Sequence, residues 1–143
     1  MTERDMSFFM KGRAAQLPEE EVVVTKRFVD DEGKPIPFRL RALPVERVEQ
    51  LQDECMRPVK SKGRRAEKEL DSKRFATRLG IESTLYPEFR DTALLQSYGV
   101  NDPVDLVKLI LSLPGEYAEW INAVQRVNGL DEDFDELVED AKN

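Results

Sequence analysis

The sequence predicts an α+β domain that is mostly α-helical, with an N-terminal antiparallel β-hairpin packed against a bundle of about four to five helices. Apolar and polar residues alternate with the period of a strand only between residues 20 and 43. Residues 44–129 instead carry apolar residues at helical spacing. Strands that are confined to the N-terminal part, rather than alternating with helices, favour α+β over α/β.

The composition limits both the organisation and the function classes. The 143 residues suffice for one domain, expected at 20–129, with an N-terminal arm (1–19) and an acidic tail (130–143). The net charge of −7 argues against general nucleic-acid binding, and the absence of histidine removes the commonest general base and metal ligand. The single cysteine fits a reducing cytoplasm, and no apolar run is long enough to span a membrane. We therefore expect no enzymatic activity, no cofactor and no metal ion.

The N-terminal arm contains one apolar cluster, Phe8, Phe9 and Met10, which can form a single turn. Such a turn can dock either on the body of the same chain or on a partner. We favour docking on the chain's own core, because ordered termini are usually held in this way.

Residues 20–43 predict the β-hairpin. The segment 30–35 has the composition of a turn, in which Gly33 can adopt a positive φ. The second strand, 36–42, contains Pro37, which lacks a backbone donor, so we expect an edge strand there. An open edge can accept a partner strand or remain solvated, and the sequence leaves both alternatives open.

Helical segments follow, several of them with recognisable ends. The segment 102–113 is apolar nearly all round, so we expect a helix that is buried on several sides. Asp91 and Asp102 are suited to cap the helices that they precede. Cys55 lies on an apolar stripe and is predicted to be a small core residue rather than a nucleophile, because no histidine can activate it. The expected helices are 44–55, 71–85, 92–97, 102–113 and 114–128.

Two charged segments stand out. Residues 57–68 are basic, but no aromatic residue is interleaved for stacking on bases, so we favour a solvated loop over an RNA or acidic-partner contact. After Gly129, seven acidic residues surround Phe134, Leu137 and Val138 at helical spacing, which is typical of a segment that orders on binding or of a solvated tail. Residues 131–136 resemble a calcium loop only weakly, because the central glycine is missing.

The order of several short motifs resembles a known family, the XkdN-like tail assembly chaperones of phages and defective prophages of Gram-positive bacteria. The resemblance runs from about Ser7 to Gly129 and leaves the acidic segment outside the matched part. The motifs that carry it are Arg27–Arg41, the lone Cys55 with the basic segment after it, Tyr86–Asp91, Leu94–Val100, Leu113–Tyr117 and Val124–Gly129.

This resemblance implies a non-enzymatic role in tail assembly. Such chaperones bind the tape measure protein, a long, helical, aggregation-prone chain, and keep it soluble in the host cytoplasm until tail tube subunits polymerise around it. They are absent from the finished virion. In many such systems a ribosomal frameshift also produces a longer product, whose extra domain recruits the tail tube protein.

A holdase for amphipathic helices needs an exposed apolar groove. Our hypothesis places that groove either on the arm at Phe8 and Phe9 or on the helix 114–128. The resemblance assigns no binding residues, and for Trp120 we favour a plain core position. The candidate residues on the helix are Tyr117, Trp120, Ile121 and Val124.

Two other function classes stay open. A small nucleic-acid-associated regulator would act through residues 57–68 and would show steep salt dependence of binding. An enzyme with carboxylate catalysis ranks last, because no convergent polar cluster is visible in the sequence.

Overall fold

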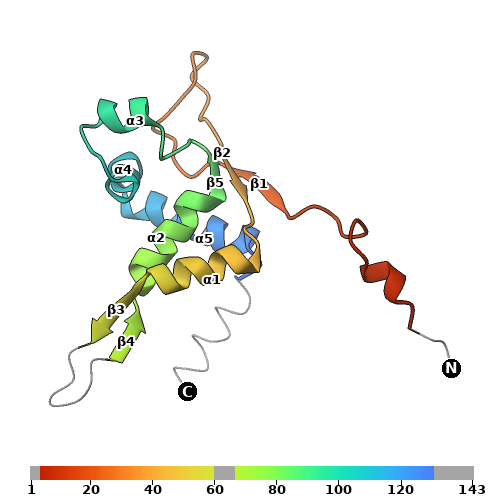
Figure 1. Ribbon diagram of the computed structural model, residues 1–143. Helices are drawn as coiled ribbons and strands as arrows, with labels where there is room; N and C mark the ends of the chain where they lie inside the picture. Colours follow the sequence, from red (N-terminus) through yellow and green to blue (C-terminus); the bar gives the residue numbers. More distant parts are fainter. Residues whose placement is uncertain (1–3, 60–66, 131–143) are drawn as a thin grey trace, which may run out of the picture.

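The computed structural model describes residues 4–59 and 67–130 and confirms the α+β class (Figure 1). Helix α2 lies at the centre of the body and contacts α1, α4, α5 and β5, while α5 also contacts β1 and β2. The elements in chain order are the 3-10 turn η1 (Met6–Phe9), β1 (Glu19–Val22), β2 (Phe38–Arg41), α1 (Val45–Glu54), β3 (Met56–Val59), β4 (Glu67–Leu70), α2 (Ser72–Ser83), β5 (Thr84–Tyr86), α3 (Thr92–Ser97), α4 (Pro103–Ile110) and α5 (Pro114–Val127).

The predicted N-terminal hairpin is present, with β1 and β2 antiparallel and Val22 opposite Phe38. The turn also forms as expected: Gly33 has φ +82°, and the Asp30 carboxylate accepts hydrogen bonds from the backbone N–H groups of Glu32 and Lys34. The strands are shorter than the alternation indicated. Between the strands, the side chains of Thr25 and Arg27 bond to Glu116, as described below. Closer to the turn the chain pairs again, because Val29 and Pro35 form an antiparallel bridge and the N–H of Ile36 donates to the carbonyl of Phe28 at 3.1 Å.

The prediction that the second strand lies at an edge is wrong. The strand order is β1-β2-β5, so β2 is central and the outer strands are β1 and β5. Pro37 is compatible with this arrangement because it precedes β2, and its missing N–H therefore falls outside the ladder. Strand β5 was expected to be the end of a helix over 71–85, but α2 ends at Ser83 and Tyr86 pairs with Arg39.

The core is organised around Trp120, which is completely buried. Its indole N–H donates a 3.0 Å hydrogen bond to the hydroxyl of Thr84. The ring packs against the backbone of α2 at Gly80, where a Cβ atom would lie 2.5 Å from Cζ2 of Trp120. Phe89 links Trp120 to Phe38 of the sheet through two edge-on ring contacts, with centroids 5.9 and 6.1 Å apart. The interpretation of Trp120 as a core tryptophan is therefore confirmed.

Local capping signals place the helix starts correctly. Asp71, Asp91 and Asp102 each accept a hydrogen bond from the first turn of the helix that follows. Helix α4, however, ends at Ile110 rather than Leu113. Its residues Leu106, Val107 and Ile110 are buried, whereas Leu109 is 44% exposed. Cys55 is buried, as predicted for a core residue.

The basic segment contains a two-stranded antiparallel sheet, β3–β4, that the sequence reasoning missed. Arg57 on β3 forms an ion pair with Glu69 on β4 at 3.0 Å and lies 4.0 Å from Asp71. The nearby carboxylates thus offset the charge of Arg57. Residues 60–66, which carry Lys60, Lys62, Arg64 and Arg65, lie outside the described residues.

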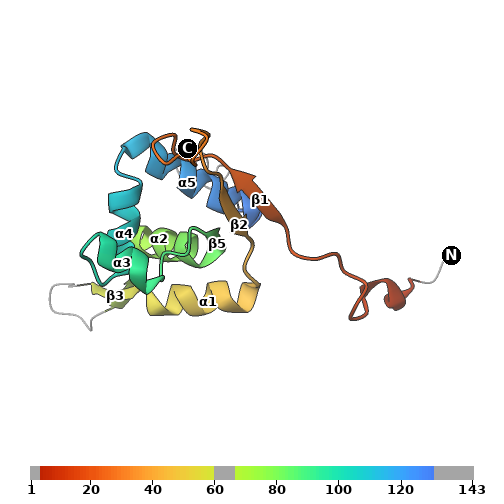
Figure 2. The same ribbon diagram turned by 90° about the horizontal axis from the view of Figure 1, so that it is seen from above.

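The N-terminal arm does not dock on the body, and this expectation is wrong. Both views show the arm extending away from the helices (Figures 1 and 2). Phe8 is 62% and Phe9 87% exposed, and the guanidinium of Arg13, also on the arm, lies over the Phe8 ring at 5.4 Å. The turn is closed by its own cap, because Asp5 accepts from the N–H of Ser7 at 2.9 Å.

This arrangement gives a stability prediction. The double substitution Phe8→Ser, Phe9→Ser should change the free energy of unfolding by less than about 0.5 kcal/mol, because neither ring is buried in the body. Urea unfolding, followed by the fluorescence of Trp120, measures the effect. A clear shift of the urea midpoint would mean that the arm packs on the body in solution.

Candidate functional site

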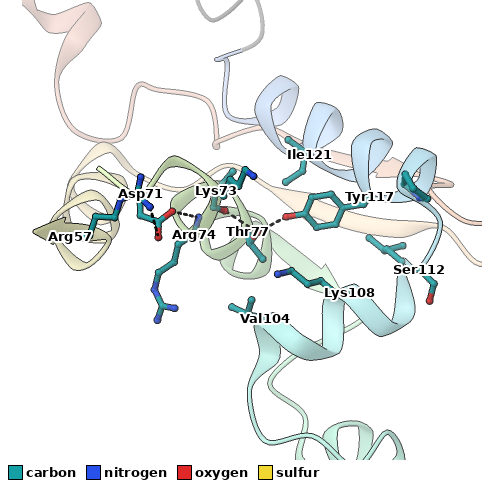
Figure 3. Close-up of a pocket in the computed structure, with 13 residues that line it drawn as sticks. Arg57, Asp71, Lys73, Arg74, Thr77, Val104, Lys108, Ser112, Tyr117 and Ile121 are labelled. Atoms are coloured by element: carbon teal, nitrogen blue, oxygen red, sulfur yellow. Dashed lines mark hydrogen bonds and ion pairs between the residues drawn. The ribbon is translucent and has the colours of Figure 1, made fainter. Parts of the chain in front are cut away.

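A groove with a volume of about 790 Å³ lies between α2, α4 and α5. Figure 3 shows it with Tyr117 and Ile121 on one side and Val104 and Lys108 on the other. We call it the α2–α4–α5 groove. Its lining residues are Arg57, Asp71, Lys73, Arg74, Ala76, Thr77, Val104, Lys108, Leu111, Ser112, Pro114, Tyr117 and Ile121.

The floor of the groove is apolar and held in place. The hydroxyl of Thr77 donates a 3.0 Å hydrogen bond to the backbone carbonyl of Lys73. Because its proton is used there, the Thr77 oxygen accepts the hydrogen bond that it shares with the hydroxyl of Tyr117. Tyr117 further packs on Trp120, with ring centroids 5.7 Å apart. A half-buried tyrosine that is fixed at both its ring and its hydroxyl offers a rigid apolar surface at low entropic cost.

The rim of the groove is basic, in contrast to the chain as a whole. Lys73 and Arg74 come from the first turn of α2, and Lys108 comes from the last turn of α4. Within residues 4–59 and 67–130, no carboxylate forms an ion pair with any of these three side chains. Asp71, the one acidic residue in the described lining, caps α2 and approaches Arg57. The rim therefore presents cations that are available to an acidic ligand.

The corner between α4 and α5, which closes one end of the groove, is fixed by Glu116. The Glu116 carboxylate accepts hydrogen bonds from Thr25 (2.5 Å), from Arg27 (2.6 and 3.0 Å) and from the N–H of Leu113 (3.2 Å). Arg27 also donates to the carbonyl of Ile110 at 2.8 Å. The same bonds draw residues 23–27 out of the hairpin ladder.

The electrostatics of this corner follow from the same contacts. The Arg27 guanidinium, together with the hydrogen bonds from Thr25 and Leu113, lowers the pKa of Glu116 to about 2, although burial of the carboxylate opposes the shift. Glu116 is thus charged at neutral pH, and it stabilises both the helix start and the corner.

A second, smaller cavity of about 130 Å³ lies between α3 and the residues that flank the 30–35 turn. Its lining is almost entirely apolar and includes Phe28, Phe38 and Tyr98. Among the described residues no charged side chain lines it, so this lining offers no group that would select a charged ligand.

The predicted binding residues separate into three groups. Tyr117 and Ile121 line the groove, but Trp120 and Val124 are at most 1% exposed and support the groove from below. The burial of Trp120 agrees with the core position favoured for it, and Val124 is buried on the same side of α5, so neither side chain is exposed in the groove. Phe8 and Phe9 lie on the arm and do not line the groove.

Sequence reasoning missed Lys73, Arg74, Lys108 and Glu116. Lys73 and Arg74 are neighbours in the sequence, but Lys108 is far from both, and only the packing of α2 against α4 brings the three to one rim. Glu116 did carry a local signal, because a glutamate three residues after a helix start is suited to bond back to that start.

Two further features of the described residues bear on function. No helix within 4–59 and 67–130 has both the length and the apolar character that a membrane crossing requires. In the same residues, no three side chains of the His, Cys, Asp or Glu type are grouped to hold a metal ion.

Comparison with known proteins decides the family. The family model described as phage XkdN-like tail assembly chaperone protein matches residues 6–142, nearly the whole chain. The chain belongs to the XkdN-like tail assembly chaperone family. The match also includes the acidic segment after Gly129, so the resemblance, which was expected to end at Gly129, extends further than the sequence motifs indicated.

Relatives of this chaperone are similar over almost their entire length. The phage-like element PBSX protein XkdN of Bacillus subtilis (strain 168) is 45% identical over 139 residues, which span 97% of this chain and 94% of the relative. The protein YqbN of the same strain is also 45% identical over 139 residues, covering 97% and 93%. The crystal structure of the protein YqbN superposes on 90% of this chain and 98% of its own, with a TM-score of 0.76 and 39% identity.

Proposed function

We propose that this chaperone binds the tape measure protein of its phage or prophage through the α2–α4–α5 groove and keeps it soluble until tail tube subunits assemble around it. In this role the chaperone is not an enzyme, acts in the host cytoplasm and is absent from the finished virion. Recruitment of the tail tube protein, by this chain or by a longer frameshifted product, completes the role. The observation that carries the proposal is the rigid apolar floor beneath a rim of available cations.

The geometry suits one class of ligand, an amphipathic helix. Such a helix inserts apolar side chains at positions i, i+3, i+4 and i+7 into a groove. The floor residues Tyr117 and Ile121 can contact that apolar stripe, while Lys73, Arg74 and Lys108 can pair with acidic residues flanking it. A long, helical client that aggregates through its apolar stripe is protected when that stripe is covered.

A charge reversal on the rim tests the proposal. The variant Arg74→Glu, Lys108→Glu should weaken client binding roughly tenfold, because two attractive contacts become repulsive. The fold should be retained, since both residues are at the surface and their effects on the helix dipoles oppose each other: Arg74 lies in a first turn and Lys108 in a last turn. The measurement is the soluble, co-purified fraction of the tape measure protein after co-expression, followed by titration of the purified pair.

The matched control is Lys26→Glu, Lys34→Glu, which makes the same change in net charge on exposed residues outside the groove. It should bind the client as the parent chain does. If both variants lose the client equally, net charge rather than the groove controls binding. If neither loses it, the groove is not the binding site.

A further inference from the structure

We propose that the acidic C-terminal segment, residues 131–143, docks in the α2–α4–α5 groove of its own chain and that a client must displace it. The displacement rests on the proposed function, whereas the docking itself does not. The segment lies outside the described residues.

The charges of the segment and the groove are complementary. The segment carries seven carboxylates and one lysine, Lys142, whereas the rim of the groove carries Lys73, Arg74 and Lys108 without ion-pair partners among the described residues. Charge opposition of this kind favours one docking surface over the rest of an acidic protein. The acidic residues of the segment are Asp131, Glu132, Asp133, Asp135, Glu136, Glu139 and Asp140.

The apolar residues of the segment match the floor of the groove. Phe134, Leu137 and Val138 are spaced at i, i+3 and i+4, which places them on one face if the segment is helical. This is the pattern of an amphipathic helix with acidic flanks, the ligand class that the groove suits. The segment therefore resembles a client in its chemistry.

The point of attachment allows the segment to reach the groove. Ile121 lines the groove, and α5 continues for six residues to Val127 before the chain reaches Leu130. At 1.5 Å per helical residue and at most about 3.6 Å per extended residue, Leu130, to which the segment is attached, lies within roughly 20 Å of Ile121. Thirteen residues span about 20 Å as a helix and more when extended, so the segment can fold back along α5.

Docking within one chain is favoured over docking on a second copy. A short tether holds the segment at an effective concentration in the millimolar range, without the loss of translational freedom that association requires. Two copies, each with a net charge of −7, also repel each other.

The experiment compares amide NMR spectra of the full chain with those of the variant Phe134→Ser, Leu137→Ser, with no client present. We expect chemical-shift changes at backbone amides of the groove, such as Ala76, Leu111 and Ser112, and none at Phe28 or Tyr98 of the second cavity. The control Phe8→Ser, Phe9→Ser removes two exposed aromatic side chains elsewhere and should leave the groove amides unchanged. High salt should shift the groove amides of the parent chain toward their positions in the tail variant, because it screens the ion pairs.

Three results would overturn the inference: unchanged groove amides in the tail variant, changes centred on the second cavity, or parent-chain groove shifts that disappear on dilution, which would mean that the segment of another copy docks. Since the spectra contain no client, a failure of tape measure binding would leave this result intact. If the client binds the groove and the docked form of the segment outnumbers the undocked form about ten to one, the tail variant should bind the client roughly tenfold more tightly than the parent chain does.

Discussion

The substitution Gly80→Ala should destabilise the fold by about 3 kcal/mol, at the upper end of the usual range for an overpacked core. In most helices this change is favourable by up to about 1 kcal/mol, because alanine has the higher helix propensity. At this position, however, the new Cβ would lie 2.5 Å from Cζ2 of Trp120. The indole is completely buried and also tied to Thr84, so it cannot move away without disturbing the core.

The measurement is urea unfolding of the parent chain and the variant, with Trp120 fluorescence as the probe. Gly115→Ala is the matched control. Gly115 is also a helical glycine, in the first turn of α5, but a Cβ added there meets no atom within 4 Å. We expect the control to be neutral or slightly stabilising. Equal midpoints for Gly80→Ala and the parent chain would show that Trp120 does not contact α2 as described.

The substitution Glu116→Gln should cost about 2–3 kcal/mol at neutral pH, the range for loss of hydrogen bonds to a charged group. The amide keeps the size of the side chain, but its NH₂ group would face N–H donors of Arg27 or Leu113. The corner between α4 and α5, which ends the groove, should loosen as a consequence.

The pH dependence identifies the charge as the cause. The pKa of Glu116 is lowered from 4.5 to about 2 in the folded chain, so its contribution is complete above about pH 4.5 and is lost as the pH falls toward 2. The difference in unfolding free energy between the parent chain and Glu116→Gln should therefore shrink across that interval. Glu119→Gln removes a charge from an exposed position on the same helix and should cost less than about 0.5 kcal/mol. A difference that stayed constant with pH would indicate a steric effect instead.

Local signals predicted much of the fold. The helices after Asp91 and Asp102 start where their capping side chains indicated, because a cap depends only on neighbouring residues. Strand β5 was missed because Thr84–Tyr86 is too short to show alternation and becomes a strand only by pairing with β2. Strand β3 was missed for the same reason. It contains Arg57 and Pro58, which are typical of a loop, and it becomes a strand only by pairing with β4.

The candidate site was predictable only in part. One helical face of α5 carries the four candidate residues Tyr117, Trp120, Ile121 and Val124. The spacing alone does not show which of them pack against the rest of the domain. The packing of α5 on α2 and the sheet decides it, burying Trp120 and Val124 and leaving Tyr117 and Ile121 in the groove. The rim cations come from two helices, so their convergence is a property of tertiary structure that no local pattern carries.

The position of Trp120 in α5, the last of the described helices, has a consequence for biosynthesis. A chain that leaves the ribosome from its N-terminus exposes the sheet and the first four helices before α5 can fill the space between them. Domain folding therefore waits until nearly all of the described chain has been made, and the nascent protein itself exposes apolar surface during that interval. A premature stop before Trp120 removes the indole that fills the core, so the remaining chain leaves the apolar residues of α2 and the sheet uncovered.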